Sequence, residues 1–246
     1  MTPPVALITG SAHRLGARTA RLLHDRGWNL IIHYRSREGQ ALDLAETMNQ
    51  QRQSSAVALQ ADLSQMPDVK RLGDLAVAHW GRLDALVNNA SVFYPTPTPD
   101  VTGNDWDTIM HTNLKAPFFL LQACLPALKK HTGSVVNLID IYSERPLPEH
   151  PLYCASKAGL AALTRAWARD LAPEVRVNGV SPGAILWPEG EAAIDTEYQN
   201  SILDKTPLRR AGTPDDIAGT IVFLLMDAPF ITGQILTVDG GRSLNI

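Results

Sequence analysis

The chain has 246 residues, 45% of them hydrophobic and 19% charged, which is enough to bury a full-sized core in one large domain or two small ones. Its 22 basic and 25 acidic residues give a formal charge of −3 without a long basic block, which argues against nucleic-acid and anionic-membrane partners. Two cysteines without metal-ligand spacing exclude a disulfide scaffold and a zinc site. Apolar runs of only about five or six residues and a start without a leader pattern predict a cytoplasmic protein.

Short β-type runs alternate with longer amphipathic stretches, a rhythm typical of parallel strands joined by right-handed helical crossovers. We expect seven strands, at Val5–Thr9, Leu30–Tyr34, Ala56–Gln60, Ala85–Asn88, Val135–Ile139, Val175–Val180 and Ile235–Val238. The expected helices are Leu15–Arg26, Gly39–Arg52, Val69–Trp80, Trp106–Lys130, Tyr153–Leu171 and a last one that is capped at Thr213 and runs to about Met226. With no repeat or linker, this order predicts a single doubly wound, Rossmann-type α/β domain over residues 1–246.

A glycine-containing turn joins the first expected strand to the first expected helix. It reads Thr9-Gly10-Ser11-Ala12-His13-Arg14-Leu15-Gly16. Glycines here let the backbone approach a pyrophosphate at a helix N-terminus, so Gly10, Arg14, Leu15 and Gly16 are candidate cofactor-binding residues. The alternative is a tight strand-to-helix turn with no ligand.

The second expected strand ends in basic residues where NAD-binding folds normally place an acid. The residues are His33, Tyr34, Arg35 and Ser36. A carboxylate at this point accepts hydrogen bonds from the ribose 2′-hydroxyl, whereas an arginine suits a 2′-phosphate. These four residues therefore predict NADPH as the cofactor, with a solvated basic turn as the alternative.

Further polar motifs follow in a fixed order along the chain. They are Asp62-Leu63, Asn88-Asn89-Ala90-Ser91, Asn113, Tyr153-Cys154-Ala155-Ser156-Lys157 and Pro182-Gly183. Tyr153 and Lys157 alone would be weak, because tyrosine and lysine one helical turn apart often make a mere surface pair. With the glycine turn, however, the ordered set resembles the short-chain dehydrogenase/reductase family over essentially the whole chain.

This resemblance assigns roles to the motifs. Asn113, Tyr153 and Lys157 would be catalytic, with Lys157 also holding the nicotinamide ribose and Asn113 completing a water-mediated proton relay. The other implied cofactor contacts are Asp62 and Leu63 beside the adenine, Asn89, Ala90 and Ser91 along the cofactor, and Pro182 and Gly183 behind the nicotinamide. An ammonium one turn from a phenol favours the phenolate, so we expect the pKa of Tyr153 to fall from about 10 toward neutral.

One position departs from the family's usual pattern, in which a serine after the fifth strand binds the substrate carbonyl. This chain has Asp140 there. A carboxyl group both donates and accepts when burial keeps it partly protonated, which suits a nitrogen heterocycle better than a ketone. Together with Arg14, the run from His33 to Ser36 and the loop carrying Ser91 and Phe93, Asp140 resembles the pteridine reductase branch, which includes bacterial dihydromonapterin reductases.

This second resemblance implies hydride transfer from NADPH to a C=N bond of a dihydropterin, with dihydrobiopterin, dihydromonapterin and dihydrofolate as candidates, and thus a place in folate or pterin metabolism. The implied substrate-binding residues are Arg14, Ser91, Phe93, Asp140, Tyr153 and Trp187, the last in a substrate loop over about residues 184–206. Phe93 would stack on the pterin, with a core role as its alternative. Trp187 is a candidate for closing over the substrate, for packing within the chain or for an oligomer contact. The immediate proton donor is Tyr153, Asp140 or a water molecule, and the sequence does not choose among them.

Two other functions remain open. A carbonyl reductase that uses NADPH, such as a 3-oxoacyl thioester reductase, fits the closing stretch from Ile231 to Gly241 equally well, although Asp140 and Phe93 weigh against it. A non-catalytic NADPH-binding module would not need the complete set of Asn113, Tyr153 and Lys157. The family resemblance also implies a homotetramer built through the two helices at Trp106–Lys130 and Tyr153–Leu171.

Overall fold

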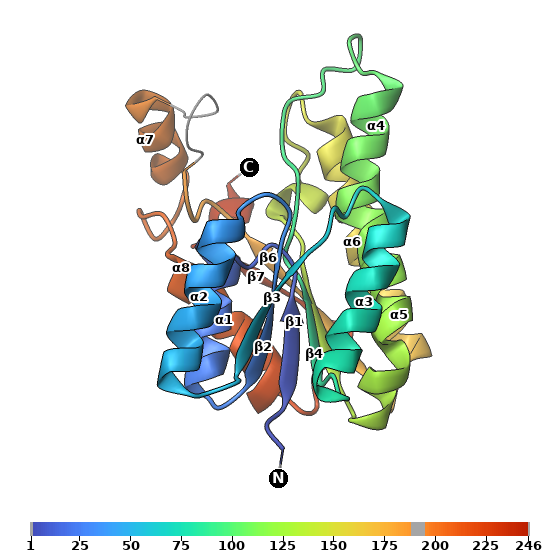
Figure 1. Cartoon of the computed structure of the whole chain (residues 1–246). Helices are drawn as coiled ribbons and strands as arrows, with labels where there is room; N and C mark the ends of the chain where they lie inside the picture. Colours follow the sequence, from blue (N-terminus) through green and yellow to red (C-terminus); the bar gives the residue numbers. More distant parts are fainter. Residues whose placement is uncertain (1, 188–194, 246) are drawn as a thin grey trace.

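The computed structural model describes residues 2–187 and 195–245. Seven parallel strands form one sheet in the order β3-β2-β1-β4-β5-β6-β7 (Figure 1). Their bounds are β1 Val5–Ile8, β2 Asn29–Tyr34, β3 Ala56–Gln60, β4 Ala85–Asn88, β5 Ser134–Leu138, β6 Arg176–Pro182 and β7 Ile235–Val238. The predicted α/β class and seven strands are confirmed, and the order reverses between β1 and β4, where open parallel sheets bind ligands.

Helices cover both faces of this sheet (Figure 1). One layer consists of α1 Arg14–Asp25, α2 Glu38–Gln51 and α8 Pro214–Val222, and the other of α3 Met66–Trp80, α5 Ala116–Lys130 and α6 Pro151–Asp170. Successive β1 residues point to opposite layers: Ala6 and Ile8 belong to the core under α1 and α8, whereas Val5 and Leu7 belong to the core under α3 and α5. Burial on both faces explains why the strands read as continuous apolar runs.

The helix expected over Trp106–Lys130 consists of three pieces. It begins earlier, at α4 Gly103–Met110, where the Thr102 side chain accepts a hydrogen bond from the Asp105 amide in a capping box. A π-helical turn, η1 His111–Lys115, separates α4 from α5. The turn holds one residue more than an α-helical turn and changes the direction in which Asn113 points. The last helix also ends in a π-helical turn, η4 Phe223–Asp227.

The segment expected as a substrate loop over about residues 184–206 contains a helix, and its role toward substrate stays a prediction. This helix, α7 Thr196–Asp204, is capped by Asp195, whose carboxylate accepts the Tyr198 amide at 2.7 Å. Its Ile202 side chain is buried and anchors it. Residues 188–194 of the predicted loop lie outside the described residues. Two short 3-10 turns, η2 Ile141–Ser143 and η5 Arg242–Leu244, complete the fold near this edge.

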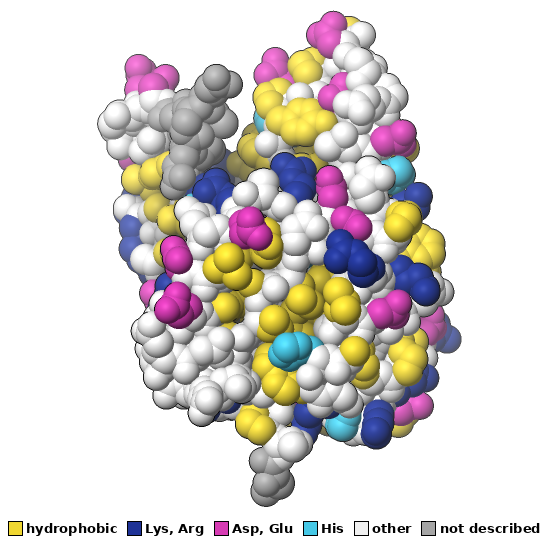
Figure 2. Space-filling model, viewed as in Figure 1, with side chains coloured by type: hydrophobic (Ala, Val, Ile, Leu, Met, Phe, Trp, Pro, Cys, Tyr) yellow, Lys and Arg dark blue, Asp and Glu magenta, His cyan; other side chains and the backbone are white. Residues whose placement is uncertain are grey.

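The carboxyl ends of the strands face a hollow. Figure 2 shows it between the projection that carries α7 and the one that carries α4, with Lys or Arg side chains at its lower edge. Within the described part of the chain, no helix has the length and apolar character needed to cross a membrane.

Candidate active site

The glycine turn after β1 is held to the end of β2 by hydrogen bonds. The Gly10 amide donates to Nδ1 of His33 at 2.9 Å, and the Ser11 amide donates to the His33 carbonyl at 3.0 Å. Gly10 has φ +63°, and a Cβ on Gly16 would lie 2.6 Å from the Gly10 oxygen, so both positions require glycine. The turn leads into α1, which starts without a side-chain cap from His13 and without an acid in its first turn. This end of α1 therefore suits an anion.

His33 lies beneath this turn rather than in the hollow. Its Nδ1 accepts from Gly10, so its Nε2 must donate to the Ala61 carbonyl, 3.1 Å away. Burial lowers the pKa of His33 to about 4, which keeps the ring neutral and this tautomer fixed at neutral pH. The ring therefore joins the loops after β1 and β3, and sequence reasoning missed this role.

The remaining residues of the basic run differ in exposure. Tyr34 is buried and donates to Glu38 Oε1 at 3.1 Å, whereas Arg35 and Ser36 are exposed at the end of β2. The Arg35 guanidinium has no hydrogen-bond or ion-pair partner within residues 2–187 and 195–245. It is therefore available to an anion at the point where the sequence predicts the cofactor phosphate.

The loop after β4 is tied to the glycine turn across the switch point. Asn89 Nδ2 donates to the Thr9 and Gly10 carbonyls at 2.8 and 3.1 Å, and the amides of Asn89 and Ala90 both donate to Thr9 Oγ1 at 3.0 Å. These bonds bring the predicted cofactor residues of two loops together.

The other predicted cofactor residues line the same edge of the sheet. The Asp62 carboxylate accepts from the Ser64 amide and hydroxyl, and Leu63 is buried next to it. At the end of β6, the Gly183 amide donates to the Val238 carbonyl at 3.1 Å, and a Cβ on Gly183 would meet Asp239 at 2.6 Å. The backbone after Pro182 thus packs directly on the turn after β7.

Asp140, Tyr153 and Lys157 form a cluster in which Tyr153 and Lys157 are buried and Asp140 is half-buried. The Tyr153 hydroxyl donates to Asp140 Oδ2 at 2.7 Å, and Asp140 Oδ1 accepts from the Tyr142 amide at 3.0 Å. Lys157 Nζ donates to the Leu138 carbonyl at 2.8 Å and lies 5.7 Å from the centre of the Tyr153 ring. Asp140 follows β5 and the other two lie one turn apart on α6, so the sheet edge and the helix together build the cluster.

The electrostatics of this cluster correct one prediction. Burial and the neighbouring Asp140 carboxylate raise the pKa of Tyr153 well above 10, so the predicted lowering by Lys157 is wrong. The sequence identified both Lys157 and Asp140, but it did not show that Asp140 accepts the hydrogen bond from the phenol and raises its pKa. Burial also raises the pKa of Asp140 and lowers the pKa of Lys157 to about 8.

Asn113 is used within the protein. Its Oδ1 accepts from the Val92 amide at 2.8 Å and from Ser91 Oγ at 3.2 Å, and its Nδ2 donates to the Val92 carbonyl and to Ser156 Oγ. The side chain thus links η1, the loop after β4 and α6. Any part of Asn113 in a proton relay must come from its backbone, and that role stays a prediction.

Two aromatic rings, Phe93 and His150, lie beside the Tyr153 phenol. Phe93 is 47% exposed, which excludes a core role. It stacks on the His150 ring with centroids 4.7 Å apart and planes at 15°, and meets Tyr153 edge-on at 4.7 Å. Sequence reasoning missed His150. Half-buried Trp187 is connected to the glycine turn, because Arg14 Nη2 donates to the Trp187 carbonyl at 3.0 Å.

The sequence is similar to those of known reductases. Residues 10–243 match the family model described as enoyl-(acyl carrier protein) reductase. Pteridine reductase 1 of Leishmania tarentolae is 34% identical over 288 aligned positions, which cover 99% of this chain and 97% of the relative. The 3-oxoacyl-(acyl-carrier-protein) reductase of Staphylococcus epidermidis RP62A is 33% identical, covering 96% and 97%, and that of Staphylococcus aureus Mu50 is 34% identical, covering 96% of each.

The chain belongs to the short-chain dehydrogenase/reductase family. It is an oxidoreductase that depends on NAD(P)H. The residues present fit such a cofactor: α1 offers an uncapped N-terminus behind a glycine turn, and Arg35 is exposed at the end of β2. Among the described residues, no group of three or more His, Cys, Asp or Glu side chains could hold a metal ion.

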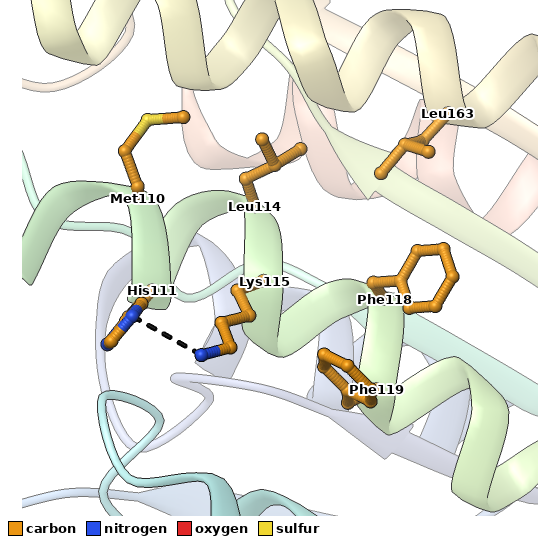
Figure 3. A pocket seen from close by; sticks show the side chains of 7 residues that line it. All are labelled: Met110, His111, Leu114, Lys115, Phe118, Phe119 and Leu163. Atoms are coloured by element: carbon orange, nitrogen blue, oxygen red, sulfur yellow. Dashed lines mark hydrogen bonds between the residues drawn. The ribbon is translucent and has the colours of Figure 1, made fainter. Parts of the chain in front are cut away.

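The short-chain reductase also carries an apolar groove away from the cluster. Met110, Leu114, Phe118, Phe119 and Leu163 line it with His111 and Lys115, from α4, η1, α5 and α6 (Figure 3). Phe118 and Phe119 are 40% and 41% exposed, and Phe118 lies 5.7 Å from the ring of Trp167. None of these residues contributes to the Asp140–Tyr153 cluster, so the groove is a separate feature.

Proposed function

We propose that this short-chain reductase is an NADPH-dependent pteridine reductase that reduces a C=N bond of a dihydropterin to give the tetrahydropterin. The observation that carries the proposal is the 2.7 Å hydrogen bond between Tyr153 and Asp140, because a half-buried carboxyl replaces the usual serine beside the phenol. A carboxyl group can accept from ring N–H groups and donate to ring nitrogens, whereas a serine suits a simple carbonyl. The similarity to pteridine reductase 1 supports the same assignment.

In this mechanism the chain supplies the proton and the orientation. NADPH, when bound, supplies the hydride to the pterin carbon. Tyr153 stays a neutral phenol because its pKa is raised, so it donates its proton to the adjacent ring nitrogen. Asp140 orients the phenol and, with its own raised pKa, takes a proton from solvent and returns it to the phenolate. Lys157 contributes positive charge that stabilises this phenolate.

The aromatic pair Phe93 and His150 supports a flat substrate. Their parallel rings form a platform beside Tyr153, and the exposed side of Phe93 offers a stacking surface for a bicyclic heterocycle. In the same proposal Ser91 and Arg14 contact the pterin, and Trp187 closes over it.

We also propose the placement of the cofactor. Arg35 and Ser36 hold the 2′-phosphate, which makes NADPH the preferred nucleotide. Asp62 and Leu63 flank the adenine, Asn89 and Ala90 lie along the cofactor, and Lys157 holds the nicotinamide ribose. Pro182 and Gly183 back the nicotinamide. The exposed position of Arg35 at the end of β2 supports the first of these assignments.

The second candidate is an NADPH-dependent 3-oxoacyl thioester reductase. The staphylococcal 3-oxoacyl-(acyl-carrier-protein) reductases favour it, because their identity to this chain is nearly the same as that of pteridine reductase 1. Asp140 weighs against it, since a carboxylate beside the phenol would repel the oxyanion that a reduced ketone forms.

A side-by-side assay tests the two candidates. NADPH oxidation is followed under air-free conditions with 7,8-dihydrobiopterin, dihydromonapterin and an acetoacetyl thioester, using the unmodified chain and D140S. We expect turnover of at least one pterin, and a loss of that turnover in D140S. Turnover of the thioester alone would overturn the pteridine assignment, as would a D140S variant that reduces pterins at the original rate.

We propose that the apolar groove is the contact between copies of the chain in a homotetramer. Exposed phenylalanines at a groove on helices are typical of interfaces rather than of free surface. Light scattering of the purified chain measures the mass, and a monomeric mass would contradict this assembly.

A further inference from the structure

The C-terminal turn η5 carries a buried arginine that the mechanism above does not use. Arg242 is 6% exposed, and its Nη2 donates to the Tyr142 hydroxyl at 3.3 Å. Its Nε and Nη1 are buried and have no hydrogen-bond partner among the residues that the structure describes. A guanidinium remains charged at every physiological pH, and burying it without a full set of acceptors is unfavourable. Packing alone would be served better by an apolar side chain, so the charge itself needs an explanation.

A chain of three hydrogen bonds connects Arg242 to the phenol. Arg242 donates to the Tyr142 hydroxyl, the Tyr142 amide donates to Asp140 Oδ1 at 3.0 Å, and Asp140 Oδ2 accepts from Tyr153 at 2.7 Å. The links come from η5, η2 and α6, which are far apart in the sequence. Arg242 thus holds the side chain of the residue whose backbone amide orients Asp140.

The turn itself is fixed by a different acid. Asp239 accepts the Gly241 amide at 2.8 Å on one oxygen and the Ser243 amide at 2.7 Å on the other. These two bonds hold the backbone on either side of Arg242. Asp239 therefore sets the position of the arginine, while the positive charge faces Tyr142 and Asp140.

We propose that Arg242 is a positioning residue for the reductase: it holds Tyr142 against Asp140 and places a permanent positive charge behind the Asp140 carboxylate. The reaction concerned is that of the proposed function, on which this inference rests. The geometry predicts that Arg242 affects proton transfer and leaves cofactor binding unchanged, because within residues 2–187 and 195–245 its side chain bonds to Tyr142 and not to the glycine turn or the end of β2.

The charges around Asp140 explain why an arginine is needed beside a lysine. Asp140 is faced by Tyr153, Cys154 and Lys157 from α6, by Tyr142 from η2 and by Arg242 from η5. Burial raises the pKa of Asp140, whereas Lys157 and Arg242 lower it. The pKa of Lys157 is itself lowered to about 8, so this cation is lost just above neutral pH. The Arg242 guanidinium stays positive above that pH and continues to limit the rise of the Asp140 pKa.

The test compares R242Q and Y142F with the unmodified chain. The Asp140 carboxyl is titrated by carbon-13 NMR, assigned with D140N, and kcat, KM and NADPH binding are measured across pH. For R242Q we expect the Asp140 midpoint and the pH profile of kcat to rise together by about one pH unit, with NADPH affinity changed less than two-fold. Y142F keeps the Arg242 cation and removes the Tyr142 hydroxyl. We therefore expect kcat to fall, with a smaller shift of the Asp140 titration midpoint than in R242Q. R209Q, which removes an exposed arginine bonded to Asp204, is the matched control and changes neither.

An unchanged Asp140 midpoint in a folded R242Q would overturn the proposal, as would an equal loss of kcat and NADPH affinity. If R242Q does not fold, R242K and Y142F decide: R242K must keep the midpoint close to its original value, and Y142F with an unchanged kcat profile would refute the role. The NMR titration needs no substrate. If the chain reduces no pterin but R242Q still shifts the Asp140 titration midpoint, the proposed function is wrong and the inference about Arg242 stands.

Discussion

The two sides of the hollow are built in different ways. On the proposed cofactor side, the loops after β1, β3 and β4 are joined by hydrogen bonds that involve His33, Thr9 and Asn89. On the substrate side, exposed aromatic rings stack on one another, and the segment after β6 is joined to the glycine turn by the bond from Arg14 to the Trp187 carbonyl. The cofactor side thus resists change, whereas the substrate side can vary between relatives without disturbing it.

The largest effect is expected from Tyr153→Phe, which separates the two sides. Removing the phenolic proton should lower kcat by about 10²–10⁴-fold, the usual contribution of a general acid. NADPH binding, measured by nucleotide fluorescence, should change little because the cofactor-side bonds are untouched. A parallel loss of NADPH affinity would show that the two sides are not independent.

The cofactor side is best tested at His33. His33→Leu leaves the Gly10 amide and the Ala61 carbonyl without their His33 partners. We therefore expect the free energy of unfolding to fall by about 2–4 kcal/mol. His33→Asn keeps an acceptor near Nδ1, and His33→Gln keeps a donor near Nε2. Each should recover part of the loss in chemical denaturation. Equal stability of Leu, Asn and Gln variants would contradict the bonding role.

His33 also predicts a pH dependence of stability. Its pKa is about 6.5 when unfolded and about 4 in the fold, so the unfolded chain binds more protons in between. The stability from the neutral ring is complete above about pH 6.5 and declines by up to about 3 kcal/mol as the pH falls to 4. Chemical denaturation at several pH values between 4 and 6.5 measures the free energy of unfolding. Its slope against pH should be shallower in His33→Asn than in the unmodified chain. The same slope in both chains would rule out His33 as its source.

Arg35→Ala sharpens the comparison within the cofactor side. Loss of a charge-assisted bond to the 2′-phosphate should weaken NADPH by about 1–3 kcal/mol and leave NADH nearly unchanged. Calorimetric titration with both nucleotides measures the difference. Arg37→Ala, which removes a neighbouring exposed arginine bonded to Gln40, is the control. Equal losses for NADPH and NADH would refute the assignment of Arg35.

The smallest effect on turnover is expected at the apolar groove, which lies apart from both sides of the hollow. Replacing Phe118 and Phe119 with serine should reduce the mass of the assembly in light scattering while kcat changes less than about two-fold, because the groove lies apart from the cluster. Phe230→Ser is the control, since this fully exposed phenylalanine lies outside the groove. An unchanged mass in the double variant would remove the groove from the interface.

Much of this arrangement could be predicted from the sequence. The five inner strands are almost completely buried, so their apolar runs stand out in the sequence. For all seven strands, no observed end differs from its predicted end by more than two residues. The cluster of Asp140, Tyr153 and Lys157 could be predicted because motif order fixes which strand ends meet. Both predictions depend on local patterns that can be recognised in the sequence alone.

Other features depend on contacts that local patterns do not encode. The direction of the Tyr153 pKa shift depends on the Asp140 carboxylate 2.7 Å away, and the role of His33 depends on the backbone of two other loops. The π-helical turns look like ordinary helix in the sequence. The helix α7 has a weak apolar face in which only Ile202 is buried, so it resembled a loop.

The π-helical turn η1 constrains the length of the chain. Ala116, Leu120 and Cys124 of α5 must face the sheet core, while Asn113 must face the loop after β4 and α6. An α-helix rotates roughly 100° per residue, so deleting a single residue in η1 would set these two requirements out of phase. The segment should accept many substitutions but no insertion or deletion, and its residue count is therefore as much a part of the site as the identity of Asn113.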